Sequence, residues 1–589
     1  MMPLLPFPEF SAAINRFKFW LEPLVGTDRD VFNLIDAFAE KEGKALYEAL
    51  KIQMEAVSPA LWLVDLWRRQ FLGLHEPLPL AGNMVMKIDW VLPQTGLKLV
   101  AHFAAAMAQV HCDYLTGNLP PLQHDNTLLN MTQWAILRGA ARRPALPRNE
   151  FWIQEPQTLS GHIVVLYRGY AWKVLIADDK ARVATPAQLE NVLYELVQTT
   201  NNNNELPFSL PSILPTEKAL EIRAQLLSRT ENNQIMKMVE NAWFILSLDD
   251  AHFSEEEDAL LDAAFGQGNN LWAYKPLNFI SHFKDDRLYV HFEHSHLDPA
   301  TVSDMMGFAR DNYECILRCR HNNLPMDLNY QAMNWTIDGR KTVEAADSGR
   351  NEETGGTFKA MSEALNDYQR QSEKWMITIQ DIFIIPQEQP LLKPYHQDAI
   401  SHLLLQFGQL ETYHKIRPMG ELVDLRHLQD GRFDWFTPLT VDSIRFVQRL
   451  QHNQATVEDF EKAIKAHEKR LRITREGLGI WGWWLALKHI AKVQGIEVPI
   501  FNHPQIQSLT NPFIHTMRLF DGACTSHIAV APPDKRGMGI HYAFDASHIS
   551  FVITHRRSKI NEIERFCRSL NSGYRQIINI LKNSGRVEL

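Results

Sequence analysis

The segment YVHFEHSHLDPATV, residues 289–302, gathers the side chains in this sequence that are best suited to acid–base chemistry. Three histidines, at 291, 294 and 296, and the aspartate at 298 fall within eight positions. His294, His296 and Asp298 could supply three ligands to a metal ion. His294 could equally act as a general base beside Asp298, because an imidazole titrates near neutral pH. A third interpretation is a solvated strand end, and spacing alone leaves all three open.

Other chemical motifs are missing from the sequence. It has no GxSxG nucleophile elbow, no P-loop and no GxGxxG, and GMGIHY at 537–542 lacks the third glycine. Its five cysteines, an odd number, form no CxxC pair or Cys/His cluster with zinc spacing, which favours a reducing, cytoplasmic setting. These observations argue against the commonest hydrolases and nucleotide-binding enzymes.

The elements that must position the histidine segment are strands and helices in alternation. PLNFISHFKDDRLYVHFEHS predicts two strands around the turn at 284–286, with the histidines at the exit of the second strand. HIVVLYRGYAWKVLI at 162–176 predicts two further strands joined by a tight turn. Residues 1–92 are predicted to be helical, with one helix starting at Ser58 and Pro59.

The composition is that of a soluble globular protein with more than one core. A chain of 589 residues is too long for a single core, and the charged, glycine-bearing stretch 338–358 is the best linker candidate between two α/β units. The net charge of −9 is not gathered into long blocks of one sign, which argues against nucleic acid as a partner. No apolar run reaches about 18 residues and the N-terminus lacks a basic signal region, so no membrane span is expected.

The motif EHSHLD at 293–298 resembles that of the carnitine/choline acyltransferases, in which a histidine after a glutamate is followed four residues later by an acidic residue. Further segments match the family in order and approximate spacing over nearly the whole chain: WLVDLW, HIVVLYRG, ETYHK, DGRFD, VDSIRFV, and GMGIHYAF followed by HISFVIT. The sequence is identified as a divergent member of this family.

The resemblance implies an α/β fold of two domains similar to chloramphenicol acetyltransferase, with a substrate tunnel at their interface. Residues 1–92 are then an N-terminal helical segment packing on the second domain. Residues 93–340 form the first domain, with the catalytic histidine, and residues 341–589 form the second, with the acceptor and donor sites. The acyl thioester enters the tunnel from one side and the acceptor from the other. A monomer is expected, as for most of the family.

The resemblance also implies which residues are catalytic, without a metal ion. His294 is the general base that takes the acceptor's proton and later protonates the leaving thiolate. Asp298 matches the family's acidic partner, and Arg432 of DGRFD matches the arginine that pairs with it. The family's Ser-Thr-Ser motif, which helps to stabilise the oxyanion, corresponds to IHTMRLF. Thr516 falls within that motif whether positions are counted forward from PIF at 499–501 or back from GMG at 537–539. Arg518 is the second candidate.

The acceptor and donor sites depart from the family pattern. Of the three residues that bind the carboxylate of carnitine, only the tyrosine has a counterpart, Tyr413, whereas Phe433 replaces the threonine and Gly482 the arginine. An underpaired buried carboxylate is costly, so carnitine is not the expected acceptor. The aromatic residues near Phe433 and Gly482 predict an apolar pocket, with core packing as the alternative. In the donor segment IPQEQPLLK, only Lys393 remains near the lysines that reach the CoA phosphates.

These changes predict an acyltransferase that moves an acyl group from a phosphopantetheine thioester to the hydroxyl of an apolar acceptor. The thioester is acyl-CoA or an acyl carrier protein, and no tightly bound cofactor is expected. Because acyltransferases of this family also occur in polyketide assembly, polyketide or other natural-product biosynthesis is the expected setting. Two alternatives remain open: a catalytically inactive family member that acts as a binding protein, and an ordinary carnitine or choline O-acyltransferase.

Overall fold

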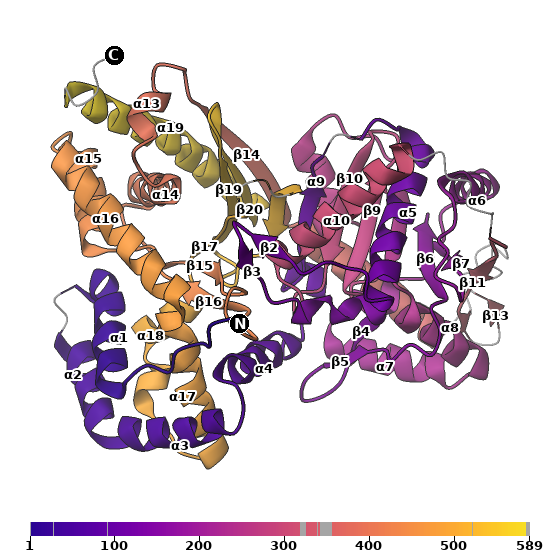
Figure 1. Cartoon of the computed structure of the whole chain (residues 1–589), viewed down its shortest axis with the longest axis horizontal. Helices are drawn as coiled ribbons and strands as arrows, with labels where there is room; N and C mark the ends of the chain where they lie inside the picture. The colour runs from indigo at the N-terminus through magenta and orange to yellow at the C-terminus, as the bar shows by residue number, and fades with distance from the viewer. Residues whose placement is uncertain are drawn as a thin grey trace.

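The computed structural model describes residues 2–26, 29–90, 92–318, 326–337, 340–341, 356–520, 522 and 524–584. Within them, two large β-sheets lie side by side, and helices cover both (Figure 1). The predicted α/β architecture with two sheet-bearing halves is therefore confirmed. The predicted linker at 338–358 falls largely outside the described residues.

The larger sheet contains the strand that leads to His294. Its strands, among the described residues, are in spatial order β11 (Tyr330–Met333), β7 (Tyr170–Ala177), β6 (Gly161–Tyr167), β8 (Ile245–Asp249), β9 (Leu277–His282), β10 (Arg287–Phe292), β1 (Met84–Ile88) and β18 (Thr525–Val530). The hairpin predicted at 162–176 is β6–β7, and the pair predicted before the histidine segment is β9–β10, both antiparallel. Both predictions are confirmed.

Helices pack against both faces of this sheet. One core includes residues of α5 (Gly96–Leu115), α6 (Pro186–Thr199) and α10 (Pro299–Arg318). The other includes residues of α7 (Thr216–Leu227), α8 (Thr230–Asn241), α9 (Glu256–Phe265) and α12 (Thr357–Ser372). Two short ladders, β2 (Gln123–His124) with β3 (Thr127–Leu128) and β4 (Ala140–Arg143) with β5 (Glu150–Ile153), lie outside the sheet, as does β12 (Thr336–Ile337) with β13 (Arg340–Lys341).

The prediction that residues 1–92 are helical is wrong for Met84–Ile88, which form β1. This strand pairs antiparallel with β10 on one side and with β18 on the other. Met84 and Met86 enter one core and Val85 the other. A strand that is buried on both faces lacks the polar alternation by which sequence marks a strand. Because β18 comes from residues 525–530, the C-terminal part of the chain contributes a strand to the larger sheet.

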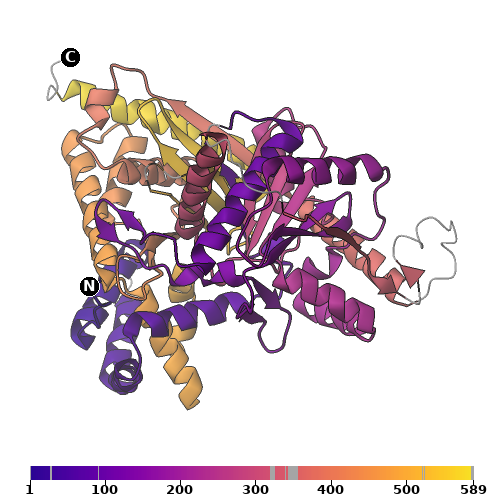
Figure 2. The ribbon, with the colours of Figure 1, turned by 45° about the vertical axis from the view of Figure 1, so that its right-hand side comes forward.

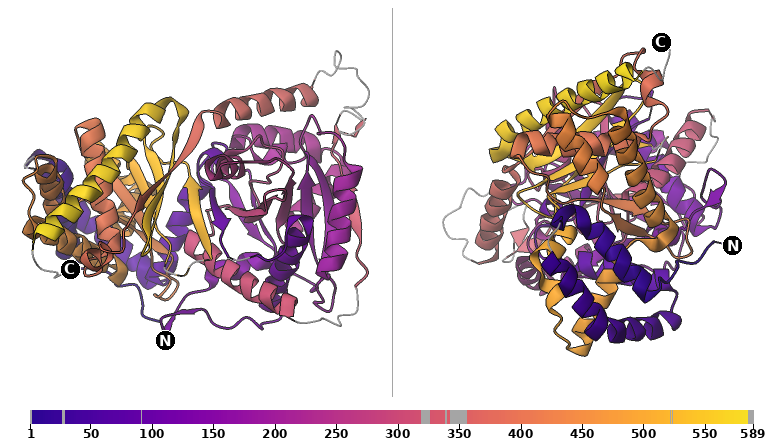
Figure 3. Two further views of the ribbon diagram at one scale, coloured as in Figure 1. Left: turned by 90° about the horizontal axis from the view of Figure 1, so that it is seen from above. Right: turned by 90° about the vertical axis from the view of Figure 1, so that its left-hand side faces the viewer.

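The second sheet carries β14 (Trp375–Phe383), β20 (His548–Arg556), β19 (Met538–Phe544), β17 (Ile514–Met517), β15 (Met419–Asp424) and β16 (Phe433–Phe436) in spatial order. Its core includes residues of α13 (Gln389–Leu392), α14 (Gln397–Tyr413), α15 (Val441–Gln451), α16 (Val457–Ile473) and α19 (Ile560–Asn583). The long α19 runs along the outside of this half, away from the larger sheet (Figure 3).

The N-terminal helices pack against the second half. They are α1 (Phe10–Val25), α2 (Arg29–Phe38), α3 (Lys44–Glu55) and α4 (Pro59–Leu72), and α4 begins at the predicted proline. They share one core with β16, α17 (Trp481–Gln494) and α18 (Pro504–Thr510). Figure 2 shows the first three of them beside the second half, far in sequence from the helices that they contact. In the described part of the chain, no helix combines the length and the apolar character needed to cross a membrane.

Candidate active site

His294 lies in the turn between β10 and α10, at the predicted strand exit. Its Nδ1 lies 2.6 Å from the carbonyl oxygen of Leu297. Because a carbonyl can only accept, Nδ1 carries the hydrogen and Nε2 presents a lone pair. Nε2 has no hydrogen-bond partner among the described residues, and His294 lines a cavity. The imidazole is therefore in the tautomer that a general base needs.

The surroundings of His294 keep it unprotonated. Burial lowers the pKa of the imidazole below its usual 6.5; Asp298 opposes this shift, and the positive charge of Arg432 adds to it. Oδ1 of Asp298 lies 3.7 Å from Nδ1, too far for a hydrogen bond, so this carboxylate acts on the ring through its charge. At neutral pH the ring is ready to accept a proton.

As the pH is lowered, the rate of acyl transfer is expected to stay constant past 6.5, the usual pKa of histidine. It should fall only when the pH drops through the lowered pKa of His294. The reason is that only the neutral imidazole can take a proton, and a lowered pKa extends the neutral form toward acid. The pH profile of kcat/KM measures this, with thermal melting at each pH as the control for folding. A rate that falls with a midpoint at or above 6.5 would contradict the burial effect.

Arg432 holds the turn that carries His294. Its Nε lies 3.0 and 2.9 Å from the two carboxylate oxygens of Asp298, and its Nη2 lies 2.9 Å from Oδ1. Its remaining donors reach the carbonyls of His294 and Ser295, each at 2.7 Å. Gln133 donates to Asp298 Oδ2 at 2.6 Å. The predicted Asp298–Arg432 contact is thus present, and the guanidinium also fixes the backbone of the turn.

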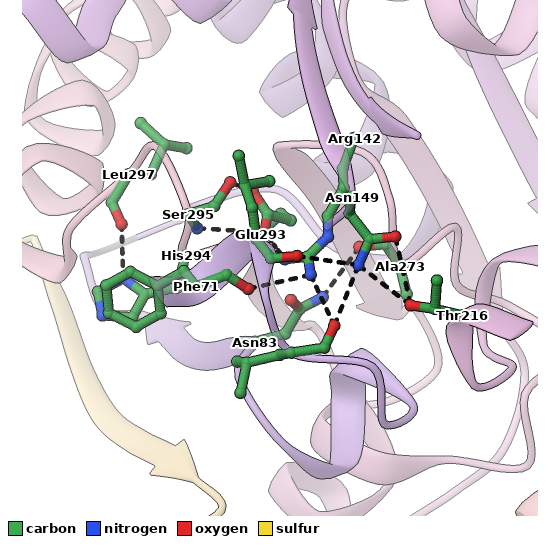
Figure 4. A network of polar contacts seen from close by, with 12 residues as sticks. Phe71, Asn83, Arg142, Asn149, Thr216, Ala273, Glu293, His294, Ser295 and Leu297 are labelled. Carbon is green, nitrogen blue, oxygen red and sulfur yellow. Dashed lines mark hydrogen bonds and ion pairs between the residues drawn. The ribbon is translucent and has the colours of Figure 1, made fainter. Parts of the chain in front are cut away.

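A second buried ion pair, between Arg142 and Glu293, also supports the turn (Figure 4). Nη1 of Arg142 lies 2.8 Å from Oε1 of Glu293, and its Nη2 donates to the carbonyl of Phe71 at 3.0 Å. The other carboxylate oxygen of Glu293 accepts from Ser295 Oγ at 2.6 Å. The Phe71 ring packs on the imidazole of His294, with centroids 4.5 Å apart. The pair therefore ties the end of α4 to the turn and places an aromatic ring against the imidazole of His294.

This support cannot be predicted from the sequence. Arg142 lies 151 positions before Glu293 and belongs to no recognisable motif. Only the fold brings β4, α4 and the turn together. The glutamate of the EHSHLD motif was the available signal, because a buried carboxylate requires a partner.

A cavity of about 440 Å³ opens in front of His294. Both halves and α4 line it, with an aromatic wall made of Trp67, Phe71, Phe433, Trp435, Trp481 and Trp484. The lining cations, histidines apart, are Lys488 and Lys535, both exposed, and Lys535 forms an ion pair with Glu76. The cavity is therefore apolar around His294 and polar toward solvent.

Thr516 does not reach this cavity, contrary to the sequence prediction. It is fully buried, and its hydroxyl donates to Glu421 Oε2 at 2.9 Å. Nε2 of His402 lies 3.2 Å from the same hydroxyl. Successive residues of a strand point to opposite faces. The neighbouring His515 points to the other face and lines the cavity instead.

Other predicted substrate-binding residues also lie away from the cavity. Tyr413 ends α14 and packs on Phe513, with ring centroids 5.4 Å apart. Lys393 is exposed after α13, and Arg518 follows β17 with Nη2 3.5 Å from Gln397. None of these three predicted residues lines the cavity in front of His294.

Gly482, which was predicted to lie in the acceptor site, does not line the cavity. Its N–H donates to Asp434 Oδ1 at 3.0 Å. A Cβ at this position would lie 3.2 Å from a methyl carbon of Leu63 and 3.5 Å from that carboxylate oxygen. A side chain at position 482 would therefore require Leu63 to shift. Of the predicted acceptor residues, Phe433 alone lies in the cavity wall.

The three-ligand metal arrangement considered from the sequence is not formed. The ring of His296 stacks on Phe151 with centroids 4.7 Å apart instead of converging with His294. Within the described ranges, the residue groups close enough to share an ion lie elsewhere: His396 with Asp398 and His467, Asp249 with Asp262 and His282, and Asp398 with His402 and Glu421.

Known proteins resemble this chain over most of its length. The profile of the family described as choline/carnitine O-acyltransferase matches residues 5–572. Mitochondrial carnitine O-palmitoyltransferase 2 of Homo sapiens is 23% identical, with 92% of this chain and 86% of the relative covered. A putative acetyltransferase of Mycoplasma pneumoniae is 20% identical, with 99% and 95% covered. Among solved structures, the trichothecene 15-O-acetyltransferase TRI3 of Fusarium sporotrichioides has a TM-score of 0.39 at 9% identity, with 87% of this chain and 94% of that chain covered. This chain belongs to the choline/carnitine O-acyltransferase family and is an acyltransferase.

Proposed function

We propose that this protein transfers an acyl group from a phosphopantetheine thioester to the hydroxyl of an apolar acceptor other than carnitine, with His294 as the general base. The observation that carries the proposal is the unpartnered Nε2 of a buried, neutral imidazole that opens into an aromatic cavity. A base in this state can take a proton from a hydroxyl held in the cavity.

The reaction is a direct transfer. Nε2 of His294 takes the acceptor's hydroxyl proton while the hydroxyl oxygen attacks the thioester carbonyl. The tetrahedral intermediate then collapses, the C–S bond breaks, and the thiolate receives the proton from the imidazolium. Asp298 stabilises that imidazolium through its charge, and Arg432 holds the turn in place.

The cavity wall supports an apolar acceptor. Carnitine carries a carboxylate that needs cationic or hydrogen-bonding partners when it leaves water. Lys535, one of the two lining lysines, is already paired with Glu76, and Lys488 is exposed. Near the base the wall is formed by rings such as Phe71 and Phe433, which offer a carboxylate nothing.

The donor segment is compatible with an acyl carrier protein as well as acyl-CoA. Leu391, at one of the family's lysine positions, is buried in the core of the second sheet. Lys393 is exposed and does not line the cavity. Weak recognition of nucleotide phosphates matters less when a carrier protein delivers the thioester, because the carrier supplies its own docking surface. We propose polyketide or other natural-product biosynthesis as the setting, because acyltransferases of this family also occur in polyketide assembly.

The test is a mass-spectrometric screen for ester products. Acyl-CoA and acyl carrier protein donors of increasing chain length are combined with a panel of apolar alcohols, carnitine and choline. The proposal expects an ester of an apolar alcohol. The absence of every ester, with binding of acyl thioesters retained, would instead identify a binding protein.

Free carnitine is expected to bind too weakly for calorimetry to detect at millimolar concentration, since both lysines of the cavity wall are exposed and Lys535 is paired with Glu76, which leaves the carboxylate of carnitine without a buried cation. The measurement is a titration of the unaltered protein with carnitine, and with an apolar alcohol from the screen as the positive control. Tight binding of carnitine would return the acceptor to the ordinary family class.

A further inference from the structure

His515 is the second imidazole that lines the cavity in front of His294. It lies on β17, where strand alternation turns Thr516 into the core and His515 toward the cavity. Its ring packs beside Trp435, with centroids 5.2 Å apart. The side chain is only 6% exposed, so it faces the cavity and not bulk solvent.

Neither ring nitrogen of His515 has a hydrogen-bond partner among the described residues. His296 is also buried without a hydrogen-bond partner, but its ring stacks on Phe151 and does not line the cavity. Elsewhere Nδ1 of His111 lies 2.8 Å from the carbonyl of Leu137, and Nδ1 of His291 lies 3.1 Å from that of Ala263. A buried polar group without a partner is costly to keep, so its presence at a cavity wall points to a ligand that completes it.

The charge state of His515 differs from that of His294 during the reaction. Burial, and then the nearby His294, lower the pKa of His515 to about 3. When His294 becomes an imidazolium, His515 therefore stays neutral. A neutral imidazole always keeps one N–H, which it can donate to an anion.

We infer that His515 is a catalytic residue that donates an N–H hydrogen bond to the oxyanion formed on the thioester carbonyl, an inference that rests on the proposed function. As the acceptor oxygen bonds to the carbonyl carbon, the C=O electron pair moves onto oxygen and the hydroxyl proton moves to His294. The hydrogen bond from His515 stabilises that oxygen until the C–S bond breaks. This replaces the hydroxyl donor that Thr516 cannot supply, because its hydroxyl is bonded in the core.

The test compares His515→Ala and His515→Gln with the unaltered enzyme, on the donor and acceptor that give ester in the product screen. We expect His515→Ala to lower kcat by about 10²- to 10³-fold with little change in KM, because an oxyanion donor acts mainly in the transition state. His515→Gln keeps an N–H donor of similar reach and is expected to retain more activity than His515→Ala.

The matched control is His111→Gln. His111 is also fully buried with a pKa lowered to about 3, but its ring stacks on Trp243 in the core of the larger sheet. It is expected to leave kcat unchanged, and melting temperatures show whether each variant is folded. A folded His515→Ala enzyme with normal kcat overturns the inference while leaving the proposed function standing. An unaltered protein that forms no ester overturns both.

A second readout does not depend on turnover. Nitrogen chemical shifts of ¹⁵N-labelled histidine, assigned by loss of signals in His515→Gln, report whether the ring is neutral. The inference expects His515 to remain neutral at pH 5. A protonated ring at that pH would overturn it, because an imidazolium beside His294 would suppress the base.

Discussion

Replacing His294 with alanine is expected to lower acyl transfer by about 10²- to 10⁴-fold, the usual contribution of a positioned general base. Of the described histidines, His294 and His515 line the cavity, and His294 is the one on the turn held by Arg432. The fold should survive, since the side chain makes one hydrogen bond, to the carbonyl of Leu297, and otherwise packs on Phe71 and Phe433. Release of free thiol from the acyl thioester in the presence of acceptor gives the rate.

His291 and His296 are the controls for this substitution, because they flank the base on the same segment. Nδ1 of His291 lies 3.1 Å from the carbonyl of Ala263, and the ring of His296 stacks on Phe151. Neither lines the cavity, so alanine at either position is expected to change the rate much less. A His294→Ala enzyme with normal activity would remove the assignment of the base.

Replacing Asp298 with asparagine is expected to reduce both stability and activity. Arg432 is 2% exposed, and the substitution would leave its buried charge without a carboxylate, a loss of about 3–5 kcal/mol in the free energy of unfolding. The turn that carries His294 would also lose its anchor, so the rate should fall even where the protein is folded. Urea unfolding and kcat/KM measured on the same preparation give the two effects.

The control is Asp65→Asn, which removes an exposed partner of Arg69 on α4. Surface ion pairs contribute about 1 kcal/mol or less, so little change is expected. Exchanging the charges at positions 298 and 432 should not restore the enzyme, because an aspartate at 432 could not donate to the carbonyls of His294 and Ser295. Equal losses in Asp298→Asn and Asp65→Asn would contradict a buried anchor.

The parts of the site that follow from short-range pattern were predictable. The strands β9 and β10 have a polar turn between two apolar runs, and this places His294 at a strand exit. The contact between Asp298 and Arg432 spans 134 positions, and only the resemblance of EHSHLD and DGRFD to a family made it predictable. Chemistry alone would not have joined two segments so far apart.

The remaining errors have physical causes. At β17, a shift of one position exchanges the two faces of a strand, so sequence counting placed Thr516 where His515 belongs. Gly482, at the position of the family's arginine, does not line the cavity, and Leu63 of α4 lies against it. Both outcomes depend on packing between segments far apart in the chain. Such packing leaves no local trace in the sequence.

The most direct test of the account uses an acceptor alcohol labelled with ¹⁸O at its hydroxyl, incubated with the unaltered enzyme and an acyl thioester. Products and intact protein are then examined by mass spectrometry. Direct transfer activated by His294 predicts an ester that retains ¹⁸O, one free thiol for each ester, and no acyl group on the protein. The same mixture with His294→Ala should give almost no ester. An acyl adduct on the protein, or ester that lacks the label, would contradict direct attack by the acceptor's oxygen.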